Sequence, residues 1–285
     1  MRTHINFDLT HYNSYRLKAS CKRAFFPETE LDILDFFKRK EPFVLLGCGN
    51  NIILSQENYD IDFLILNDIY DNIIIDLDSK IIEAESGATM LHISKLAMDN
   101  GLSGIEMFYD IPSSLGGAIV MNAGASGEEI KDVLLKVRYL DIRDMQIREI
   151  LKEEISFGYR NSFFQRNTDK IVLKAWLKLQ SGDRNLIQQK MEDIKSKRWE
   201  KQPKEFPNAG SVFKRPSGYY VGAIIEDLGL KGLTIGGAKI SEKHGGFIVN
   251  YNNAKGEDIV KLIEIVRSKV WDEYGINLEI EQRII

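Results

Sequence analysis

The segment at residues 157–164 (Phe-Gly-Tyr-Arg-Asn-Ser-Phe-Phe) places one arginine, Arg160, among aromatic and small residues. A guanidinium in such surroundings can be held in a fixed orientation beside a carboxylate or an enolate. An arginine on a surface loop is the commoner alternative for this pattern. The segment therefore indicates either an anion-stabilising group or an ordinary loop.

Residues 208–216 (Asn-Ala-Gly-Ser-Val-Phe-Lys-Arg-Pro) place Ser211 on a bend with its hydroxyl free. A hydrolase elbow is excluded, because Phe213 stands at the second glycine position of Gly-x-Ser-x-Gly. Lys214 and Arg215 add positive charge where an anionic substrate could dock. The alternative is a serine that only caps a helix.

The last strand carries two carboxylates, Glu279 and Glu281, which strand periodicity places on one face. Such carboxylates are usually solvated, but one of them could face a site formed by earlier loops.

Two small-residue loops could receive a phosphate-bearing ligand. Residues 46–53 (Leu-Gly-Cys-Gly-Asn-Asn-Ile-Ile) follow an apolar strand, and free N–H groups in such a loop form an anion nest. The loop lacks the dinucleotide-binding fingerprint, since Ile52 stands at its third glycine position and we expect no helix after it. In residues 111–127, Gly116, Gly117 and the segment 122–124 would supply backbone N–H groups to phosphates and ring edges. For both loops, tight turns without a ligand remain the alternative.

Other chemistries find little support in the sequence. The four histidines (His4, His11, His92 and His244) lack ligand spacing, so we expect no metal. Two cysteines, Cys21 and Cys48, favour a reducing cytoplasm over a disulfide-built domain. The formal net charge of −4 argues against a general nucleic-acid binder. We expect no membrane segment and no signal peptide, because long apolar runs are missing.

The elements that must position these residues follow from periodicity and turn signals. The 285 residues predict an α+β protein with many short strands before residue 180 and a compact α/β unit after about residue 205. Helices are expected at 28–40, 89–100, 183–200, 219–228 and 256–274. The third should pack along a stripe of Leu186, Ile187, Met191 and Ile194, and the last along a face of Ile259, Leu262, Ile263, Val266 and Val270. Strands are expected at 43–46, 62–66, 72–75, 80–84, 133–142, 146–151, 170–179, 247–249 and 277–285. We expect 133–142 to pair with 146–151, and the alternation of apolar and polar residues in 170–179 indicates a half-buried strand.

Taken together and in order, these motifs resemble the UDP-N-acetylenolpyruvoylglucosamine reductase (MurB) family of flavoenzymes. The resemblance runs over nearly the whole chain. It is carried by residues 12–15, 46–51, 101–106, 111–117, 121–124, 159–163, 209–216, 236–238, 241–244, 247–250 and 278–281.

The resemblance implies a two-part FAD-binding unit of the vanillyl-alcohol-oxidase (PCMH) type and a C-terminal α/β substrate-binding domain. The expected parts are residues 1–75 (FAD-binding subdomain 1), 76–200 (FAD-binding subdomain 2) and 201–285 (substrate-binding domain). The short stretch between Arg160 and Lys201 is similar to the subtype that lacks an inserted substrate loop.

The implied reaction uses noncovalent FAD and NADPH to reduce UDP-N-acetylglucosamine enolpyruvate to UDP-N-acetylmuramate, a step in peptidoglycan precursor synthesis. The partners would be the UDP-sugar and NADPH, without nucleic acid or membrane, in a cytoplasmic monomer or weak homo-oligomer. Ser211 would donate the proton that quenches an enolate, which Arg160 and Glu281 would stabilise. The positions implied for FAD contact are Gly47, Cys48, Gly49, Asn50, Asn51, Ile111, Pro112, Ser113, Ser114, Gly116, Gly117, Asn122, Ala123 and Gly124. Those implied for the substrate are Tyr159, Lys201, Lys214 and Arg215.

Four positions depart from the family pattern. Ser113 stands where the family usually has Gly, and Asp110 where it commonly has Gly or Ala. Cys48 and Asn50 replace a usual Gly and a usual Ser. Ser113 adds a Cβ where the backbone would approach the cofactor. Ser113 and Asp110 therefore raise a non-catalytic sugar-nucleotide binder as an alternative function. A flavin oxidase of the same superfamily is a further alternative.

Overall fold

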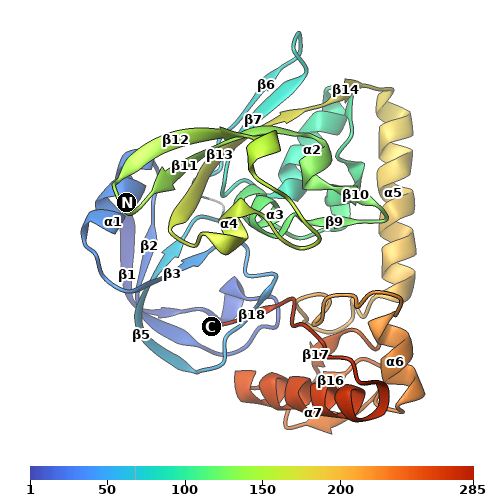
Figure 1. Ribbon diagram of the computed structural model, residues 1–285. Coiled ribbons are helices and arrows are strands. Elements are labelled where there is room, and N and C mark those ends of the chain that lie inside the picture. Colours follow the sequence, from blue (N-terminus) through green and yellow to red (C-terminus); the bar gives the residue numbers. More distant parts are fainter. Residues whose placement is uncertain (68) are drawn as a thin grey trace. The chain divides into compact units, whose positions relative to one another are not determined.

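The computed structural model describes residues 1–67 and 69–285, which divide into two compact units (Figure 1). Unit 1 comprises Met1–Thr3, Phe25–Cys48 and Phe63–Arg198. Unit 2 comprises His4–Ala24, Gly49–Asp62 and Trp199–Ile285. The chain passes from one unit to the other several times before residue 75, so no single cut separates them in the sequence.

Unit 1 is built on a five-stranded antiparallel sheet with the order β12-β11-β13-β7-β6. Its strands are β6 (Ile73–Asp76), β7 (Ile81–Glu85), β11 (Leu134–Asp141), β12 (Gln146–Leu151) and β13 (Lys170–Lys178). The helices are α1 (Glu30–Lys38), α2 (Met90–Asp99), α3 (Leu115–Met121), α4 (Phe163–Arg166) and most of α5 (Arg184–Lys201). Short 3₁₀ turns lie at η2 (Glu106–Asp110), η3 (Ile130–Asp132) and η4 (Lys152–Glu154). Two short hairpin pairs complete it, β9 (Gly124–Ala125) with β10 (Glu128–Glu129) and β8 (Leu102–Ser103) with β14 (Gln180–Ser181).

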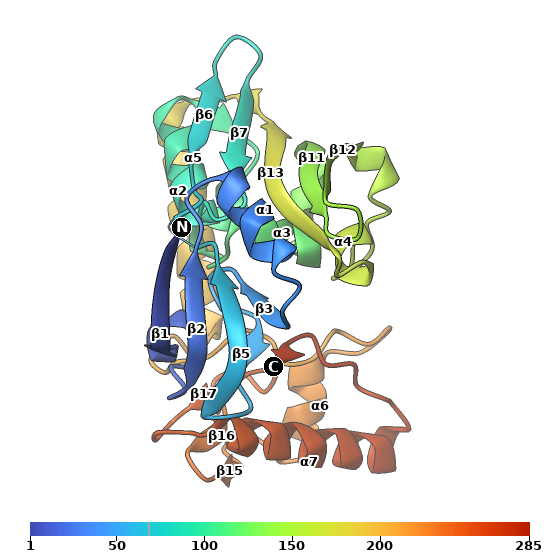
Figure 2. The same ribbon diagram turned by 90° about the vertical axis from the view of Figure 1, so that its left-hand side faces the viewer.

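Both faces of this sheet are covered, which differs from the half-buried strand expected at 170–179. Val172 and Ala175 pack with α2, α3 and α4, whereas Ile171 and Leu173 pack with α1 on the opposite face (Figure 2). Residues 171–173 are therefore buried without interruption. The alternation of apolar and polar residues is visible only further along, where α1 no longer covers the strand.

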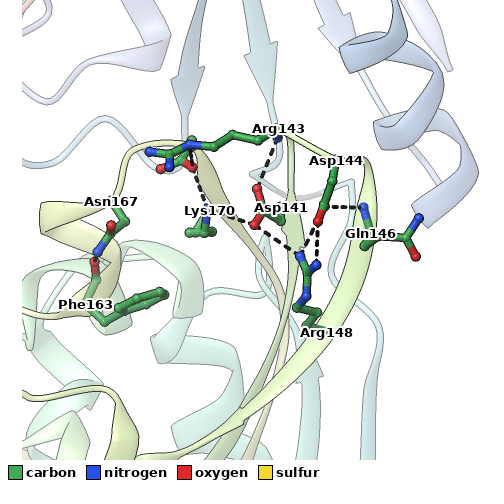
Figure 3. Close-up of polar contacts among 9 residues, drawn as sticks. Asp141, Arg143, Asp144, Gln146, Arg148, Phe163, Asn167 and Lys170 are labelled. Atoms are coloured by element: carbon green, nitrogen blue, oxygen red, sulfur yellow. Dashed lines mark hydrogen bonds and ion pairs between the residues drawn. The ribbon is translucent and has the colours of Figure 1, made fainter.

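The turn between β11 and β12 is held by charged side chains, as Figure 3 shows. The Arg148 guanidinium donates to Asp141 and Asp144, and the Lys170 ammonium lies 2.9 Å from the same Asp141 carboxylate. Met145 takes a positive φ of 59° at the turn. The pairing expected for residues 133–142 and 146–151 is thereby confirmed.

Unit 2 contains a long amphipathic helix, α7 (Gly256–Tyr274), beside a small sheet of order β15-β16-β17 (Figure 1). The sheet strands are β15 (Thr234–Ile235), β16 (Ala238–Ile240) and β17 (Ile248–Asn250), and α6 (Val221–Asp227) precedes them. The apolar face expected for this last helix is confirmed, because Ile259, Leu262, Ile263, Val266 and Val270 are all buried.

Several elements were not anticipated in the sequence. Strands β1 (Arg2–Asp8) and β2 (Ser20–Phe26) belong to a four-stranded sheet of order β1-β2-β5-β3, with β5 at Asn58–Ile65 and β3 at Phe43–Leu46. The short helix α3 occupies part of the segment read as turns or ligand-contacting backbone. The 3₁₀ turn η1 (Thr10–Tyr12) precedes β2.

The expected last strand, residues 277–285, is only partly regular. It pairs as an isolated bridge between Phe213 and Ile280 and then as β18 (Arg283–Ile284), which runs parallel to β4 (Ile52–Ile53). In α5, Ile187 and Met191 are buried as expected, but Leu186 is 66% exposed and does not belong to the packed stripe.

None of the helices in the described residues is long and apolar enough to cross a membrane. The same described residues contain no group of three or more histidine, cysteine and carboxylate side chains arranged to hold a metal ion.

Candidate active site

In unit 1, the loop at residues 111–114 leads into α3 and presents unused backbone donors. The Met90 N–H donates to the Ser113 carbonyl at 2.9 Å, which pins the loop to the start of α2. The Ser114 hydroxyl caps α3 by accepting a hydrogen bond from the Gly117 N–H at 3.2 Å. In the described part of the chain, the backbone N–H groups of Ser113 and Ser114 donate to no protein acceptor. Ile111 packs against the unit 1 core, and Pro112 is exposed.

The structure corrects part of the donor set expected for this region. The Gly116 N–H donates to the Ser86 carbonyl at 2.9 Å, and the Ala123 N–H to the Ala118 carbonyl at 2.8 Å. The N–H groups of Gly117 and Asn122 are likewise engaged, because residues 115–121 form a helix whose first turn and C-cap use them. The expectation that these four groups donate to phosphates is therefore wrong.

Close packing joins the first glycine of the 46–53 loop to this helix cap. A Cβ atom at Gly47 would lie 2.4 Å from the Ser114 Oγ, so only glycine fits there. Beside it, the Cys48 Sγ lies 2.7 Å from the Asn67 Oδ1. Within unit 1, Gly47 and residues 113–117 thus form one continuous small-residue surface.

The rest of the 46–53 loop belongs to unit 2 and has the geometry of an anion nest. Gly49 has a φ of 65°, and a Cβ there would lie 2.0 Å from the Tyr12 carbonyl oxygen. The next two residues, Asn50 and Asn51, lead into β4 rather than into a helix, as expected. In the described residues, the backbone N–H groups of Gly49, Asn50 and Asn51 donate to no protein acceptor. Successive unspent N–H groups after a left-handed residue are suited to a phosphate.

Arg160 is fixed by the loop that follows α3. Asn122 ends this helix in the left-handed conformation, with φ 46°, and its Nδ2 donates to the Gly158 carbonyl at 3.0 Å. The Arg160 guanidinium donates to the carbonyls of Gly124 at 2.8 Å and Asn122 at 3.4 Å. It also lies 5.2 Å from the centre of the Tyr159 ring, which is exposed. The arginine is therefore held in a defined orientation, and the reading as an unconstrained surface arginine does not apply.

In unit 2, Ser211 and Glu281 lie on two paired segments. The Glu281 N–H donates to the Val212 carbonyl at 2.8 Å, and Phe213 bridges to Ile280. Ser211 itself bridges to Phe247 on its other side. The Ser211 side chain is exposed and does not cap a helix, whereas Glu281 is half-buried. The backbone segments around Ser211 and Glu281, which are 70 positions apart in the sequence, thus lie side by side.

Gln282 positions the serine segment and was missed in the sequence. Its side-chain amide donates to the carbonyls of Ala209 at 3.0 Å and Gly210 at 3.2 Å, and its Oε1 accepts from the Tyr15 hydroxyl at 2.9 Å. Gln282 and Tyr15 are both buried, and burial raises the pKa of Tyr15 far above its usual value of about 10. The sequence did contain a signal for the burial of Gln282, because this residue follows Leu278 and Ile280 at strand spacing on the inward face.

The turn at residues 241–246 supports the other side of the Ser211 segment. The Ser241 hydroxyl accepts from the N–H groups of Lys243 and His244, and the His244 Nδ1 accepts from the Gly246 N–H at 3.1 Å. The Gly246 carbonyl in turn accepts the Val212 N–H at 3.0 Å. Burial lowers the pKa of His244, and the positive charge of Lys231 lowers it further.

The cationic residues expected at the substrate have different surroundings within unit 2. Lys214 pairs with the Glu279 carboxylate, so Glu279 is the solvated member of the two terminal carboxylates. The Arg215 guanidinium lies 3.7 Å from the centre of the Tyr220 ring. Lys201 is exposed at the end of α5.

Asp110, one of the positions that depart from the family pattern, has a partner in unit 1. Its carboxylate accepts a hydrogen bond from the Arg198 Nε at 2.8 Å, and both side chains are largely buried. Nearby, the Tyr109 hydroxyl lies 3.2 Å from Glu192, and Lys190 lies 3.2 Å from the buried Glu106. Polar contacts with α5 thus fix η2 immediately before the 111–114 loop.

The residues around this loop fit an FAD group. Besides the unspent N–H groups of Ser113 and Ser114, three buried side-chain oxygens have no hydrogen-bond partner in the described residues: Ser113 Oγ in the loop, Ser86 Oγ, and Asn122 Oδ1 at the far end of α3. The buried Ser113 Oγ shows that this hydroxyl is not turned toward solvent. A cofactor with phosphate oxygens and ring donors would match the small-residue surface and its donors.

Comparison with models of protein families gives the class of protein to which the chain belongs. Residues 23–150 match the model of an FAD-binding domain, and residues 202–285 match that of the UDP-N-acetylenolpyruvoylglucosamine reductase C-terminal domain. The chain therefore has an α+β fold that combines an FAD-binding domain with a C-terminal domain of the reductase type.

Full-length relatives then give the family. The chain is 40% identical to the UDP-N-acetylenolpyruvoylglucosamine reductase of Caldanaerobacter subterraneus subsp. tengcongensis, over 100% of this chain and 94% of the relative. It is also 40% identical to that of Francisella tularensis subsp. tularensis, over 97% of this chain and 98% of the relative. The crystal structure of the Thermus caldophilus enzyme (MurB) superposes with a TM-score of 0.84 at 29% identity, covering 99% of this chain and 98% of that one. The chain belongs to the UDP-N-acetylenolpyruvoylglucosamine reductase family.

Replacing Gln282 by leucine (Gln282→Leu) is expected to lower both stability and turnover. The change leaves the Tyr15 hydroxyl and two backbone carbonyls without their partner, and one buried unsatisfied group costs about 1–3 kcal/mol. Urea unfolding measures the stability, and kcat at saturating substrate reports the displaced Ser211 segment. Gln189→Leu, on the exposed face of α5, is the matched control. Unfolding and kcat equal to those of the unmodified protein would contradict this role.

A pH prediction follows from His244. Because its pKa is lowered in the folded state, its contribution to stability is complete above the unfolded value of about 6.5 and is lost as the pH falls below it. We expect the free energy of unfolding to decrease between pH 7 and pH 5 in the unmodified protein and to decrease less in His244→Gln. His92→Gln, an exposed site on α2, serves as control. Parallel pH profiles for all three proteins would exclude the prediction.

Proposed function

We propose that this chain is an FAD-dependent enzyme that uses NADPH to reduce UDP-N-acetylglucosamine enolpyruvate to UDP-N-acetylmuramate, a step in peptidoglycan precursor synthesis. The observation that carries the proposal beyond family membership is a backbone pairing: the Glu281 N–H donates to the Val212 carbonyl, so the segment with the exposed Ser211 adjoins the segment with the half-buried Glu281. An exposed hydroxyl can give a proton to a substrate carbon, and a half-buried carboxyl group can stabilise an enol form.

FAD, when bound, supplies the centre that accepts a hydride from NADPH and delivers it to the enolpyruvyl group. Within unit 1, the backbone N–H groups of Ser113 and Ser114 would hold it; within unit 2, those of Gly49, Asn50 and Asn51 are suited to a phosphate. Gly47, Cys48, Ile111, Pro112, Gly116, Gly117, Asn122, Ala123 and Gly124 would line the same surface without all donating to it. Small residues here keep the backbone accessible to a large planar group.

The protein side chains would then manage the charge and the proton on the substrate. As the methylene carbon receives the hydride, negative charge develops on the neighbouring carbon and its carboxylate. Arg160 would stabilise this enolate, because carbonyls of residues 122 and 124 already fix its guanidinium and little reorganisation is needed. Ser211 would give its proton to the neighbouring carbon, and Glu281 would stabilise the enol form.

The alternative raised by the departures, a non-catalytic sugar-nucleotide binder, loses its basis. Asp110 is neutralised by Arg198, and the Ser113 hydroxyl is buried in the protein. In the described residues, neither of these two contacts favours a non-catalytic binder. Residues 1–75, 76–200 and 201–285 remain the proposed parts, and we further propose a cytoplasmic monomer or weak homo-oligomer.

The spectrum of the purified protein tests the proposal. We expect a visible flavin absorbance band that bleaches when NADPH is added without oxygen and recovers when the enolpyruvyl substrate is added. A colourless protein that does not bind added FAD would contradict the assignment. A reduced protein that reacts rapidly with oxygen, releases peroxide and ignores the enolpyruvyl substrate would be an oxidase instead.

The role of Ser211 has its own test. In Ser211→Ala, NADPH should reduce the flavin as in the unmodified protein, whereas reduction of the enolpyruvyl group should fall by about 10²–10⁴-fold, the effect of removing one positioned acid. Stopped-flow absorbance follows the two half-reactions separately. Ser268→Ala on the exposed face of α7 is the control. Equal losses in both half-reactions would remove Ser211 from the proton-donor role.

A further inference from the structure

Helix α5 is attached to unit 1 through polar side chains more than through apolar ones. Two of its 18 residues, Ile187 and Met191, are buried. Figure 1 shows the helix running along the side of unit 1 that carries β9 and β10, where the Lys190 ammonium lies 3.2 Å from the Glu128 carboxylate. Because so little of the helix is buried, its charged contacts contribute much of what keeps it in place.

These charged contacts differ in burial. Arg184 pairs with Asp99 of α2 at 3.0 Å, and both side chains are 53% exposed. Arg198, near the other end of α5, pairs with Asp110 of η2 at 2.8 Å, and these side chains are only 20% and 10% exposed. Water and salt screen an exposed pair, whereas a largely buried pair leaves an uncompensated charge when one partner is removed. Of the two pairs, Arg198–Asp110 is therefore the one whose loss should alter its surroundings.

Asp110 is the last residue of η2 before the loop that presents the unspent N–H groups of Ser113 and Ser114. The far side of this loop is fixed by the backbone, since the Met90 N–H donates to the Ser113 carbonyl at 2.9 Å. The near side is fixed at Asp110, whose carboxylate accepts a hydrogen bond from the Arg198 Nε at 2.8 Å. Only two residues separate Asp110 from Ser113, so a displacement of Asp110 passes directly to the donors.

The pair also determines the charge beside those donors. Asp110 lies at most about 11 Å from Ser113 along the backbone, since three extended residues reach no further. This distance is comparable with the screening length of about 8 Å at physiological salt, so an unpaired carboxylate at Asp110 would still repel phosphate oxygens at the loop. The Arg198 guanidinium compensates that negative charge.

We propose that Arg198 and Asp110 are a positioning pair for the cofactor. Arg198 holds Asp110, and with it the N-terminal side of the 111–114 loop, so that the backbone N–H groups of Ser113 and Ser114 are set to receive FAD. It also cancels the carboxylate charge that would repel the FAD phosphates. The proposal rests on the proposed function, because FAD is the group that this loop would receive. Arg198 acts through Asp110 and not through a contact of its own with FAD.

A double-mutant cycle on FAD affinity tests the pair. FAD is removed from the full-length protein, and the Kd for added FAD is measured from the quenching of its fluorescence. In Arg198→Met, which removes the charge and keeps an apolar stem, the Kd should rise about 10- to 100-fold, as expected for the loss of one charge-assisted hydrogen bond. Asp110→Ala should raise the Kd less, because no unpaired carboxylate remains.

The double variant Asp110→Ala/Arg198→Met separates positioning from a general structural effect. Its Kd for FAD should equal that of Asp110→Ala and lie below that of Arg198→Met, because Arg198 has no role once the carboxylate is gone. This comparison involves no unpaired buried carboxylate, so it holds even where Arg198→Met does not fold. Arg184→Met is the matched control, because it removes the exposed ion pair of the same helix and should leave the Kd unchanged.

Hydrogen–deuterium exchange without FAD examines the loop itself. In Arg198→Met, peptides that cover residues 106–116 should exchange several-fold faster than in the unmodified protein, because one anchor of the loop is lost. Peptides from β11 and β12 should exchange at unchanged rates, and Arg184→Met should leave residues 106–116 as they are.

The outcomes separate this proposal from the proposed function. An unchanged Kd for FAD in Arg198→Met, or unchanged exchange at residues 106–116, would overturn the positioning role alone. A double variant that binds FAD more weakly than Asp110→Ala would also overturn it, because Arg198 would then act on FAD without Asp110. The expected pattern of Kd values in a protein whose flavin NADPH does not reduce would sustain the positioning role and overturn the reductase assignment.

Discussion

Backbone pairing by the last residues of the chain determines where the functional groups of unit 2 lie. The Glu281 N–H bonds to Val212 beside Ser211, and the Arg283 N–H bonds to the Asn51 carbonyl in the nest loop at 3.0 Å. The Asn51 Nδ2 also donates to the Glu281 carbonyl at 3.1 Å. One terminal segment thus places an exposed hydroxyl, a carboxyl group and the loop proposed to bind phosphate relative to one another. A shift of one residue would turn these side chains to the opposite face.

Unit 1 holds one cation, the Arg160 guanidinium, in a single defined orientation. The left-handed Asn122 ends α3 and directs two backbone carbonyls at the Arg160 guanidinium. The same helix begins at the Ser114 cap, which touches the space left by Gly47. A helix of seven residues therefore connects the proposed cofactor surface at its start with the proposed enolate-stabilising arginine at its end. Its short length keeps both ends within one packed core.

Residues that depart from the family pattern are accommodated by local contacts. Asp110 adds a carboxylate, and Arg198 compensates its charge in a largely buried ion pair. A buried charge is tolerated when it is paired and hydrogen-bonded, whereas an unpaired one is costly. Sequence comparison alone flags such positions as anomalies, because the compensating residue lies 88 positions away.

The sequence by itself determined the elements with a clear period and the motifs with a clear chemistry. The buried stripe of α7 and the paired strands β11 and β12 were predictable, since one repeating face packs in each. It also pointed to the glycine loops, Arg160, Ser211 and Glu281 as residues of interest, through local composition and the resemblance they carry together. Local spacing was sufficient there because neighbouring residues decide the signal.

Only the tertiary structure decided the rest. Strand β1 is almost wholly exposed, so no apolar alternation marks it in the sequence, and its hydrogen-bonding partners decide its conformation. Helix α3 is rich in glycine, and its cap and core contacts outweigh that poor local propensity. The long-range partnerships of Gln282 with Tyr15 and of Glu281 with Val212 join residues far apart in the chain. No local pattern specifies such pairs, because their energy comes from burial and hydrogen bonding that exist only after folding.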